Sequence, residues 1–177
     1  MKFLPDAIKA GAATALVAAL VAGAATAQTR VDAKQDWSIF EAGQGQQKVC
    51  WIVTQPKRST AERGGQTVQV NRGDIYLMVS VRPGDDVKNE VSFLSGYPFK
   101  EGSTVEISVG SDKFTMFTDG ENAWTSSKAD DDRLTAAFRG GSDAKTVGVS
   151  SRGTTTRDTF SLMGFTAALN SAQQRCS

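Results

Sequence analysis

The sequence contains no histidine, and this absence removes the most common designs of enzymatic sites. Ser-His-Asp and Cys-His nucleophilic sites depend on histidine, the side chain whose pKa lies nearest neutrality. A general acid or base in this chain would have to be a carboxylate or a lysine with a shifted pKa. Zinc binding is poorly supported as well, because only Asp and Glu remain as co-ligands beside two cysteines. We therefore expect a protein without enzymatic activity, metal or cofactor.

The sequence also lacks an excess of charge of either sign. It has 20 basic and 19 acidic side chains. Lys2, Lys9 and Asp6 lie within residues 1–27, so 18 basic (20 minus 2) and 18 acidic (19 minus 1) side chains remain in residues 28–177. Nucleic-acid-binding proteins concentrate Lys and Arg on one face, and no run of this sequence does so. We expect no nucleic-acid partner, and after residue 27 no apolar segment long enough to span a membrane.

The only long apolar run lies near the N-terminus. A short basic segment precedes an Ala-rich stretch, Gly11–Ala25, which is followed by Thr26 and Ala27. A basic start, a short apolar run and small residues at a cleavage position are typical of a secretory signal peptide. We predict that residues 1–27 are a signal peptide and that residues 28–177 form a single β-rich domain in the periplasm or outside the cell.

Only two cysteines are present, Cys50 and Cys176. In a chain that is sent to an oxidising compartment, such a pair is most economically interpreted as a disulfide. The bond would close nearly the whole domain, which in the chain-entropy model stabilises the fold by roughly 4 to 5 kcal/mol.

Short apolar alternations broken by Gly and Pro dominate residues 28–177. Half-buried strands alternate in this way, and Gly and Pro supply the backbone angles of tight turns. The predicted strands are centred on Trp37–Phe40, Val49–Thr54, Val68–Val70, Ile75–Val81, Val91–Leu94, Val105–Val109, Phe114–Thr118 and Val147–Val149. Ile75–Val81 is apolar at nearly every position and predicts a central strand buried on both faces. The whole is typical of an antiparallel β-sandwich or a partly open barrel.

Two segments have helical spacing instead. Asp130-Asp131-Asp132 suits a helix N-terminus, and the apolar residues after it predict a short helix near 130–139. A C-terminal helix near 162–175 is predicted from four residues at steps of four, three and four: Phe165, Leu169, Ala172 and Cys176. This spacing places Cys176 on the core side, so the disulfide would join the last helix to the Val49–Thr54 strand.

Several blocks of sequence, spread over residues 37 to 176, resemble one known family. The blocks are Cys50–Lys57, Arg72–Ile75, Val91–Phe93, Gly96–Phe99, Ser151–Thr154, Asp158–Leu162 and Gly164–Ala168. The chain is similar in these blocks to the invasion-associated locus B family, exported proteins of Gram-negative bacteria named for a member linked to entry of a pathogen into host red cells. The resemblance implies a cell-envelope or secreted, virulence-associated role and carries over no catalytic residues.

Arg72-Gly73-Asp74 is a candidate binding motif, because host integrins bind this tripeptide when a loop tip displays it. The triplet also falls between two predicted strands, where a polar turn containing glycine is needed in any case. We favour the turn and keep Arg72 and Asp74 as candidate binding residues.

Three aromatic residues are further candidates for a binding site. Tyr97 and Phe99 flank Pro98, and Trp124 follows a turn, so these rings could gather at one end of the fold and bind a sugar or a peptide. The alternative is that they cover the open end of the core. Trp51, next to Cys50, is expected to pack in the core against the disulfide.

The sequence leaves three functional hypotheses. The favoured one is a non-enzymatic, exported protein that binds a protein, an envelope component or a host surface, and it predicts a flat exposed apolar patch without a deep cleft. The second is a lectin-like module for a glycan or small ligand, with a concave site lined by Tyr97, Phe99 or Trp124. The third is a carboxylate-based envelope hydrolase, which requires two converging carboxylates, one with a raised pKa. A Ser-Lys dyad at Ser126, Ser127 and Lys128 is disfavoured, because such a tripeptide arises easily in an exposed loop.

Overall fold

The computed structural model describes residues 28–177. The predicted signal peptide, residues 1–27, lies outside the described residues. Within 28–177, neither helix has the length and apolar character that crossing a membrane would need.

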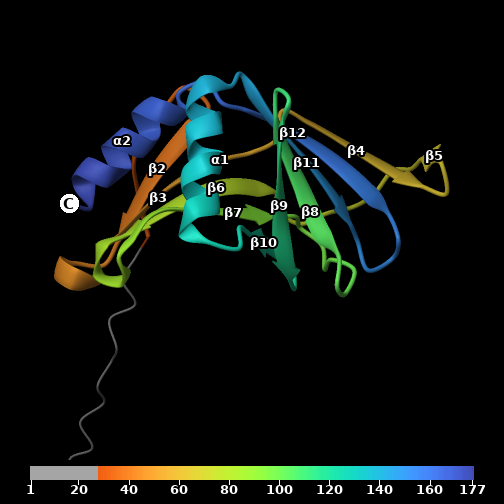
Figure 1. The fold of residues 1–177 in the computed structure, drawn as a ribbon, viewed down its shortest axis with the longest axis horizontal. Coiled ribbons are helices and arrows are strands. Elements are labelled where there is room, and N and C mark those ends of the chain that lie inside the picture. The colour runs from red at the N-terminus through yellow and green to blue at the C-terminus, as the bar shows by residue number, and fades with distance from the viewer. Residues whose placement is uncertain (1–27) are drawn as a thin grey trace, which may run out of the picture.

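Strands make up most of the regular structure, and two α-helices follow late in the chain (Figure 1). The strands are β1 (Thr29–Lys34), β2 (Trp37–Ala42), β3 (Val49–Thr54), β4 (Arg58–Arg63), β5 (Gln66–Thr67), β6 (Tyr76–Arg82), β7 (Val87–Leu94), β8 (Thr104–Val109), β9 (Asp112–Asp119), β10 (Asn122–Trp124), β11 (Asp143–Val149) and β12 (Thr155–Ser161). The helices are α1 (Lys128–Gly140) and α2 (Phe165–Arg175), with 3-10 turns at Gly45–Gln47 and Pro83–Asp85.

All strands belong to one antiparallel sheet of twelve strands. Their order across it is β1-β2-β3-β6-β7-β10-β9-β8-β11-β12-β4-β5, with β1 and β5 at the two edges. A contact across the sheet shows that it is strongly curved. Phe93 of β7 packs edge-on against Phe160 of β12 with ring centroids 5.9 Å apart, although four strands lie between β7 and β12 in the sheet. The predicted mainly β, antiparallel fold with two helices is therefore confirmed.

The core lies between the inner face of the curved sheet and the two helices. In Figure 1, α1 and α2 lie next to each other over the part of the sheet formed by β2, β3, β6 and β7. Phe165 of α2 packs edge-on against both Trp37 of β2 and Phe138 of α1, at centroid distances of 5.1 and 5.2 Å. Each of these helices is amphipathic, so packing one face on the sheet buries its apolar residues and leaves its charged residues in solvent.

The predicted disulfide is present and joins α2 to β3. Cys176, at the C-terminal end of α2, is bonded to Cys50, and both residues are buried. The bond closes a loop of 126 residues, nearly the whole described chain.

Two strand predictions differ from the structure. The expected strand at Val68–Val70 is absent. β5 ends at Thr67, one further backbone bond joins Val68 to Ala61, and the side chain of Arg72, described below, helps to hold the segment that follows. The strand predicted at Ile75–Val81 exists as β6, but only Leu77, Val79 and Val81 are buried. Its other face is half-exposed, because both helices cover the same face of this part of the sheet.

Candidate functional site

The outer face of β2, β3 and β6, opposite the helices, carries an aromatic groove. Alternation along each strand sends one set of side chains into the core and the other set outward. Phe40 and Trp51 point outward from neighbouring strands and stack with ring planes 10° apart and centroids 5.5 Å apart. Both are half-buried. The prediction that Trp51 packs in the core was wrong by one step of this alternation, since Cys50 takes the inward position.

The groove on this face has a volume of about 1000 Å³. Its apolar floor consists of Phe40, Val49, Trp51, Val53, Tyr76 and Met78. Its charged lining residues are Arg30, which is the strand partner of Phe40, and Lys57 and Asp36, which form an ion pair of 2.5 Å. We call this surface the outer groove.

A second hollow of about 670 Å³ lies where β7, β10 and the start of α1 meet. It exists because β10 pairs only with Ser92–Leu94 of β7, which leaves the first half of β7 without a strand on that side. The first turn of α1 fills part of the gap: Asp131 accepts a hydrogen bond of 2.8 Å from the backbone N–H of Val91. We call this hollow the notch.

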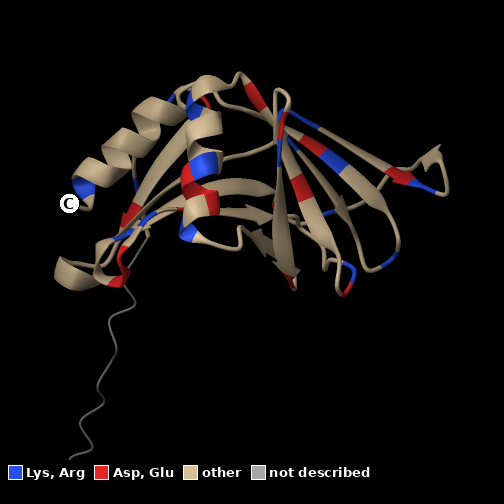
Figure 2. Ribbon diagram, viewed as in Figure 1, with Lys and Arg blue, Asp and Glu red and all other residues tan. Residues whose placement is uncertain are grey.

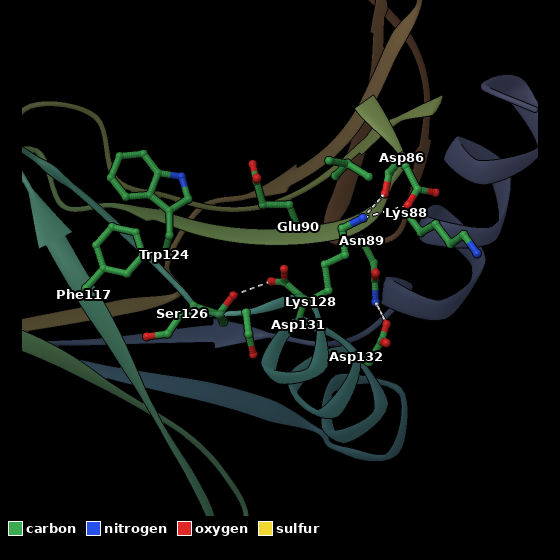
Figure 3. Close-up of a pocket in the computed structure, with 13 residues that line it drawn as sticks. Asp86, Lys88, Asn89, Glu90, Phe117, Trp124, Ser126, Lys128, Asp131 and Asp132 are labelled. Atoms are coloured by element: carbon green, nitrogen blue, oxygen red, sulfur yellow. Dashed lines mark hydrogen bonds and ion pairs between the residues drawn. The ribbon is translucent and has the colours of Figure 1, made fainter. Parts of the chain in front are cut away.

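Figure 3 shows the two walls of the notch. One wall is aromatic, with Trp124 of β10 stacked on Phe117 of β9 at a centroid distance of 5.7 Å. The other wall is polar and includes Asn89, Asp131 and Asp132. Trp124 is thus the one aromatic candidate from the sequence that lines a large hollow.

The carboxylates of the notch are already engaged in hydrogen bonds. Glu90 accepts two hydrogen bonds of 2.9 Å from the guanidinium of Arg82. Asp132 accepts a bond of 2.9 Å from the Asn89 amide. Burial raises the pKa of Asp131, and the negative charges of Glu90 and Asp132 raise it further, whereas its hydrogen bonds from Thr125 and Val91 lower it. Asp131 therefore serves as an anchor between β7 and α1.

The Ser-Lys arrangement is not assembled among the described residues. The ammonium group of Lys128 donates to the side chain and the carbonyl of Asp86 at 2.8 and 2.9 Å. The Ser127 hydroxyl caps α1 by accepting from the backbone N–H of Asp130. Each group thus has a structural partner.

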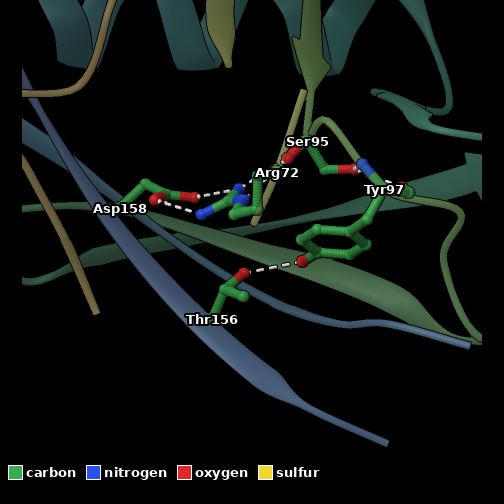
Figure 4. Close-up of polar contacts among 5 residues, drawn as sticks. All are labelled: Arg72, Ser95, Tyr97, Thr156 and Asp158. Atoms are coloured by element: carbon green, nitrogen blue, oxygen red, sulfur yellow. Dashed lines mark hydrogen bonds and ion pairs between the residues drawn. The ribbon is translucent and has the colours of Figure 1, made fainter. Parts of the chain in front are cut away.

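Arg72 of the candidate tripeptide is buried in a polar network (Figure 4). Its guanidinium forms two bonds with the carboxylate of Asp158, at 2.7 and 2.8 Å, and two more with the carbonyl of Ser95. The exposed fractions of the Arg72 and Asp158 side chains are 7% and 0%. Asp74 is exposed on the segment that follows. The network turns the Arg72 guanidinium inward, so it is not displayed on a loop tip. Arg72 and Tyr97 line a small hollow of about 200 Å³.

Tyr97 and Phe99 belong to the same end of the core. The Tyr97 hydroxyl is 2.6 Å from that of Thr156, and its ring lies 5.0 Å below the Arg72 guanidinium. Phe99 is buried and packs edge-on against Tyr97. The structure therefore brings Arg72, Tyr97 and Phe99 together and places Trp124 elsewhere.

Strand pairing aligns residues of the outer face that the sequence analysis treated separately. Val53, Met78, Ser92, Trp124 and Phe117 are successive partners across β3, β6, β7, β10 and β9. No local signal reveals this row, because its members come from five strands. Phe117 was missed as a site residue, although its outward position follows from the alternation in Phe114–Thr118.

Comparisons with known proteins agree with this architecture. The family described as invasion associated locus B (IalB) protein matches residues 37–173. The crystal structure of invasion associated protein B from Bartonella henselae aligns with a TM-score of 0.54 and 20% sequence identity, over 81% of this chain and 96% of that one. This likeness concerns the fold alone. A search of curated proteins found no match. From the family match, which spans most of the sequence, the chain belongs to the invasion associated locus B family.

Proposed function

We propose that this protein is exported and acts without catalysis, by binding a protein of the cell envelope or of a host surface through the outer groove. The observation that carries the proposal is the uncharged aromatic floor of that groove on the sheet face that neither helix covers. Half-exposed aromatic, Met and Val side chains surrounded by a polar rim are the composition of a protein interface core.

The arrangement also favours binding on energetic grounds. Phe40, Trp51 and Met78 each keep part of their apolar surface in contact with water. Covering this surface with a partner would release the water at about 25 cal/mol per Å² of apolar area. Because strand pairing fixes the backbones of all three residues, little conformational entropy would be lost on binding.

Export is supported by the character of residues 1–27 and by the disulfide. Disulfides persist in oxidising compartments such as the periplasm and the extracellular space. Cell fractionation followed by N-terminal sequencing tests this part of the proposal. We expect the protein outside the cytosol with Gln28 as its first residue; a cytosolic protein that begins at Met1 would contradict it.

The notch supports binding in preference to hydrolysis. A hydrolase would need one carboxylate free to give up a proton and a second free to attack or to activate water. Glu90, Asp131 and Asp132 instead hold Arg82, the β7 edge and Asn89 in place. These bonds account for their positions without a catalytic role.

Photo-crosslinking tests the outer groove directly. We would place p-benzoylphenylalanine at Tyr76, on the floor of the groove, and in a matched strain at Lys145, which points outward from β11. The proposal predicts a discrete protein adduct from the Tyr76 position, either in intact bacteria or in bacteria in contact with host cells. It predicts no adduct from the Lys145 position. Equal labelling from both positions, or none from Tyr76, would overturn it.

A further inference from the structure

We propose that the notch is a second binding site, for a sugar ring of a neutral or amino-sugar glycan. The notch and the outer groove share no lining residue, so this inference does not depend on the partner proposed above. Its basis is an aromatic wall that faces fixed hydrogen-bonding groups across a hollow of about 670 Å³.

The aromatic wall suits the apolar face of a pyranose. Such a ring presents C–H groups on its faces and hydroxyl groups around its edge, so it packs flat on an aromatic side chain. Trp124 and Phe117 are direct strand partners, and their rings stack with planes 28° apart. Phe117 is exposed to solvent over 47% of its surface. The pair thus offers an apolar platform that is already in place and open to solvent.

The opposite wall suits the hydroxyl groups. Asn89, Glu90 and Asp132 provide amide and carboxylate groups there. Their bonds to neighbouring residues fix their orientation, and a carboxylate oxygen with one partner retains a lone pair for a second. Asp132, for example, accepts the hydrogen bond of Asn89 through its Oδ1 atom. Among the described residues, no side chain donates to its Oδ2 atom. Fixed acceptors beside an apolar platform match a ring with an apolar face and a polar edge.

Charge narrows the class of sugar. Four carboxylates line the notch, from Asp86, Glu90, Asp131 and Asp132, against the ammonium groups of Lys88 and Lys128. Lys128 pairs with Asp86, and Arg82 pairs with Glu90. The carboxylates of Asp131 and Asp132 then remain against the ammonium group of Lys88. This excess of negative charge would repel an anionic sugar. It would not repel a neutral sugar or a protonated amino sugar.

Saturation-transfer NMR on residues 28–177 tests this inference with three monosaccharide probes: methyl glucopyranoside, glucosamine and glucuronate. We expect transfer to the first two and binding of glucuronate weaker by about tenfold or more. A second arm with lipopolysaccharide core oligosaccharide, peptidoglycan fragments and host-type N-glycans distinguishes the sources of the ring. Absence of binding to every probe, or equal binding of glucuronate, would overturn the inference.

Variants locate the signal. Trp124→Ala removes the platform and should abolish the transfer, whereas Trp124→Phe should retain part of it. If Trp124→Ala unfolds, Asp132→Asn and Phe117→Ala report on the two walls separately. Trp51→Ala, in the outer groove, is the matched control and should leave sugar binding unchanged. Sugar binding that survives loss of Trp124, or that disappears with Trp51, would contradict the assignment to the notch.

Discussion

At the scale of single residues, the ion pair of Arg72 and Asp158 stabilises the end of the core that contains Tyr97 and Phe99. Burying two charges costs several kcal/mol per ion, and the cost is recovered only where geometry and further hydrogen bonds are good. Here the bond between them is bidentate, and Ser95 and Tyr97 complete the surroundings of the guanidinium. The segment after β5 also makes backbone hydrogen bonds, from Val68 to Ala61 and from Gly73 to Gly96, and the network adds side-chain bonds to them.

Breaking this pair should be costly. Asp158→Asn preserves the shape of the side chain but leaves the Arg72 charge buried without a counterion, so we expect a loss of about 3 to 5 kcal/mol in the free energy of unfolding. Urea denaturation measures it. The matched control is Glu106→Gln, whose partner Lys113 is a surface residue with 67% of its side chain exposed. The control should change stability by less than about 1 kcal/mol, and similar losses for both variants would contradict the role of the network.

Asp131 should give the stability an unusual dependence on pH. Its pKa is raised above the ordinary value of 3.8, chiefly by burial. The folded protein therefore binds this proton more tightly than the unfolded chain does, and the resulting stabilisation is present at low pH and is lost as pH rises through 3.8 and the raised folded value.

The matched pair Asp131→Asn and Asp36→Asn tests the sign. We expect the wild-type free energy of unfolding, relative to the Asp131→Asn variant, to fall as pH rises from strongly acidic toward neutral. Asp36 has the opposite shift, because its bond to Lys57 lowers its pKa, so wild-type stability relative to Asp36→Asn should rise over the same range. Slopes of the same sign for the two variants would refute the assignment.

At the scale of elements, the position of α2 depends on contacts at both of its ends. At the C-terminal end the disulfide holds it to β3. At the N-terminal end Gly164 has a positive φ of 89°, and a Cβ atom there would lie 2.0 Å from the carbonyl oxygen of Lys34. Only glycine allows the helix to start so close to the hairpin between β1 and β2.

Gly164→Ala should therefore destabilise the protein through two effects, backbone strain and a clash. Gly110→Ala is the matched control, because Gly110 also has a positive φ, of 56°, but has no atom within 4 Å of an added Cβ. We expect the control to cost about 1 kcal/mol and Gly164→Ala several times as much. Thermal unfolding of the two variants measures the difference. Equal costs would mean that the close approach to Lys34 does not matter.

Loss of the disulfide tests separately the attachment of the C-terminal end of α2. In the chain-entropy model, opening a loop of 126 residues costs roughly 4 to 5 kcal/mol. Cys176→Ser should lower the thermal midpoint by about 10 °C under oxidising conditions. Reduced wild-type protein should unfold near the same temperature as the variant. An unchanged midpoint would show that the bond does not stabilise the fold.

Elements with strong local patterns were the ones that the sequence could predict. β3 has the predicted bounds, Val49–Thr54, because a short apolar run rich in β-branched and aromatic residues is flanked by polar segments. β1 has weak local preference and forms by pairing with β2, so it was not predicted. Trp51 shows the limit most clearly, since the pattern identifies its strand but not which of two apolar sets faces the core.

At the scale of the whole molecule, the proposed function depends on which face of the sheet the helices leave open. Both helices pack on the inner face, which leaves the outer groove uncovered, while the short β10 opens the notch beside it. Figure 2 shows acidic and basic residues interspersed over the molecule, so association would not be driven by a field of one sign. Neither surface follows from local sequence, because each is assembled by long-range strand order.

Binding of residues 28–177 to a detergent extract of cell envelopes or host-cell membranes, compared between two variants, tests the central claim most directly. We predict that Trp51→Ala weakens the apparent affinity about tenfold or more while its thermal midpoint shows that it remains folded. Lys145→Ala, on the outer face of β11, should bind like the wild type. Equal affinity of wild type and a folded Trp51→Ala variant would contradict a role for the outer groove.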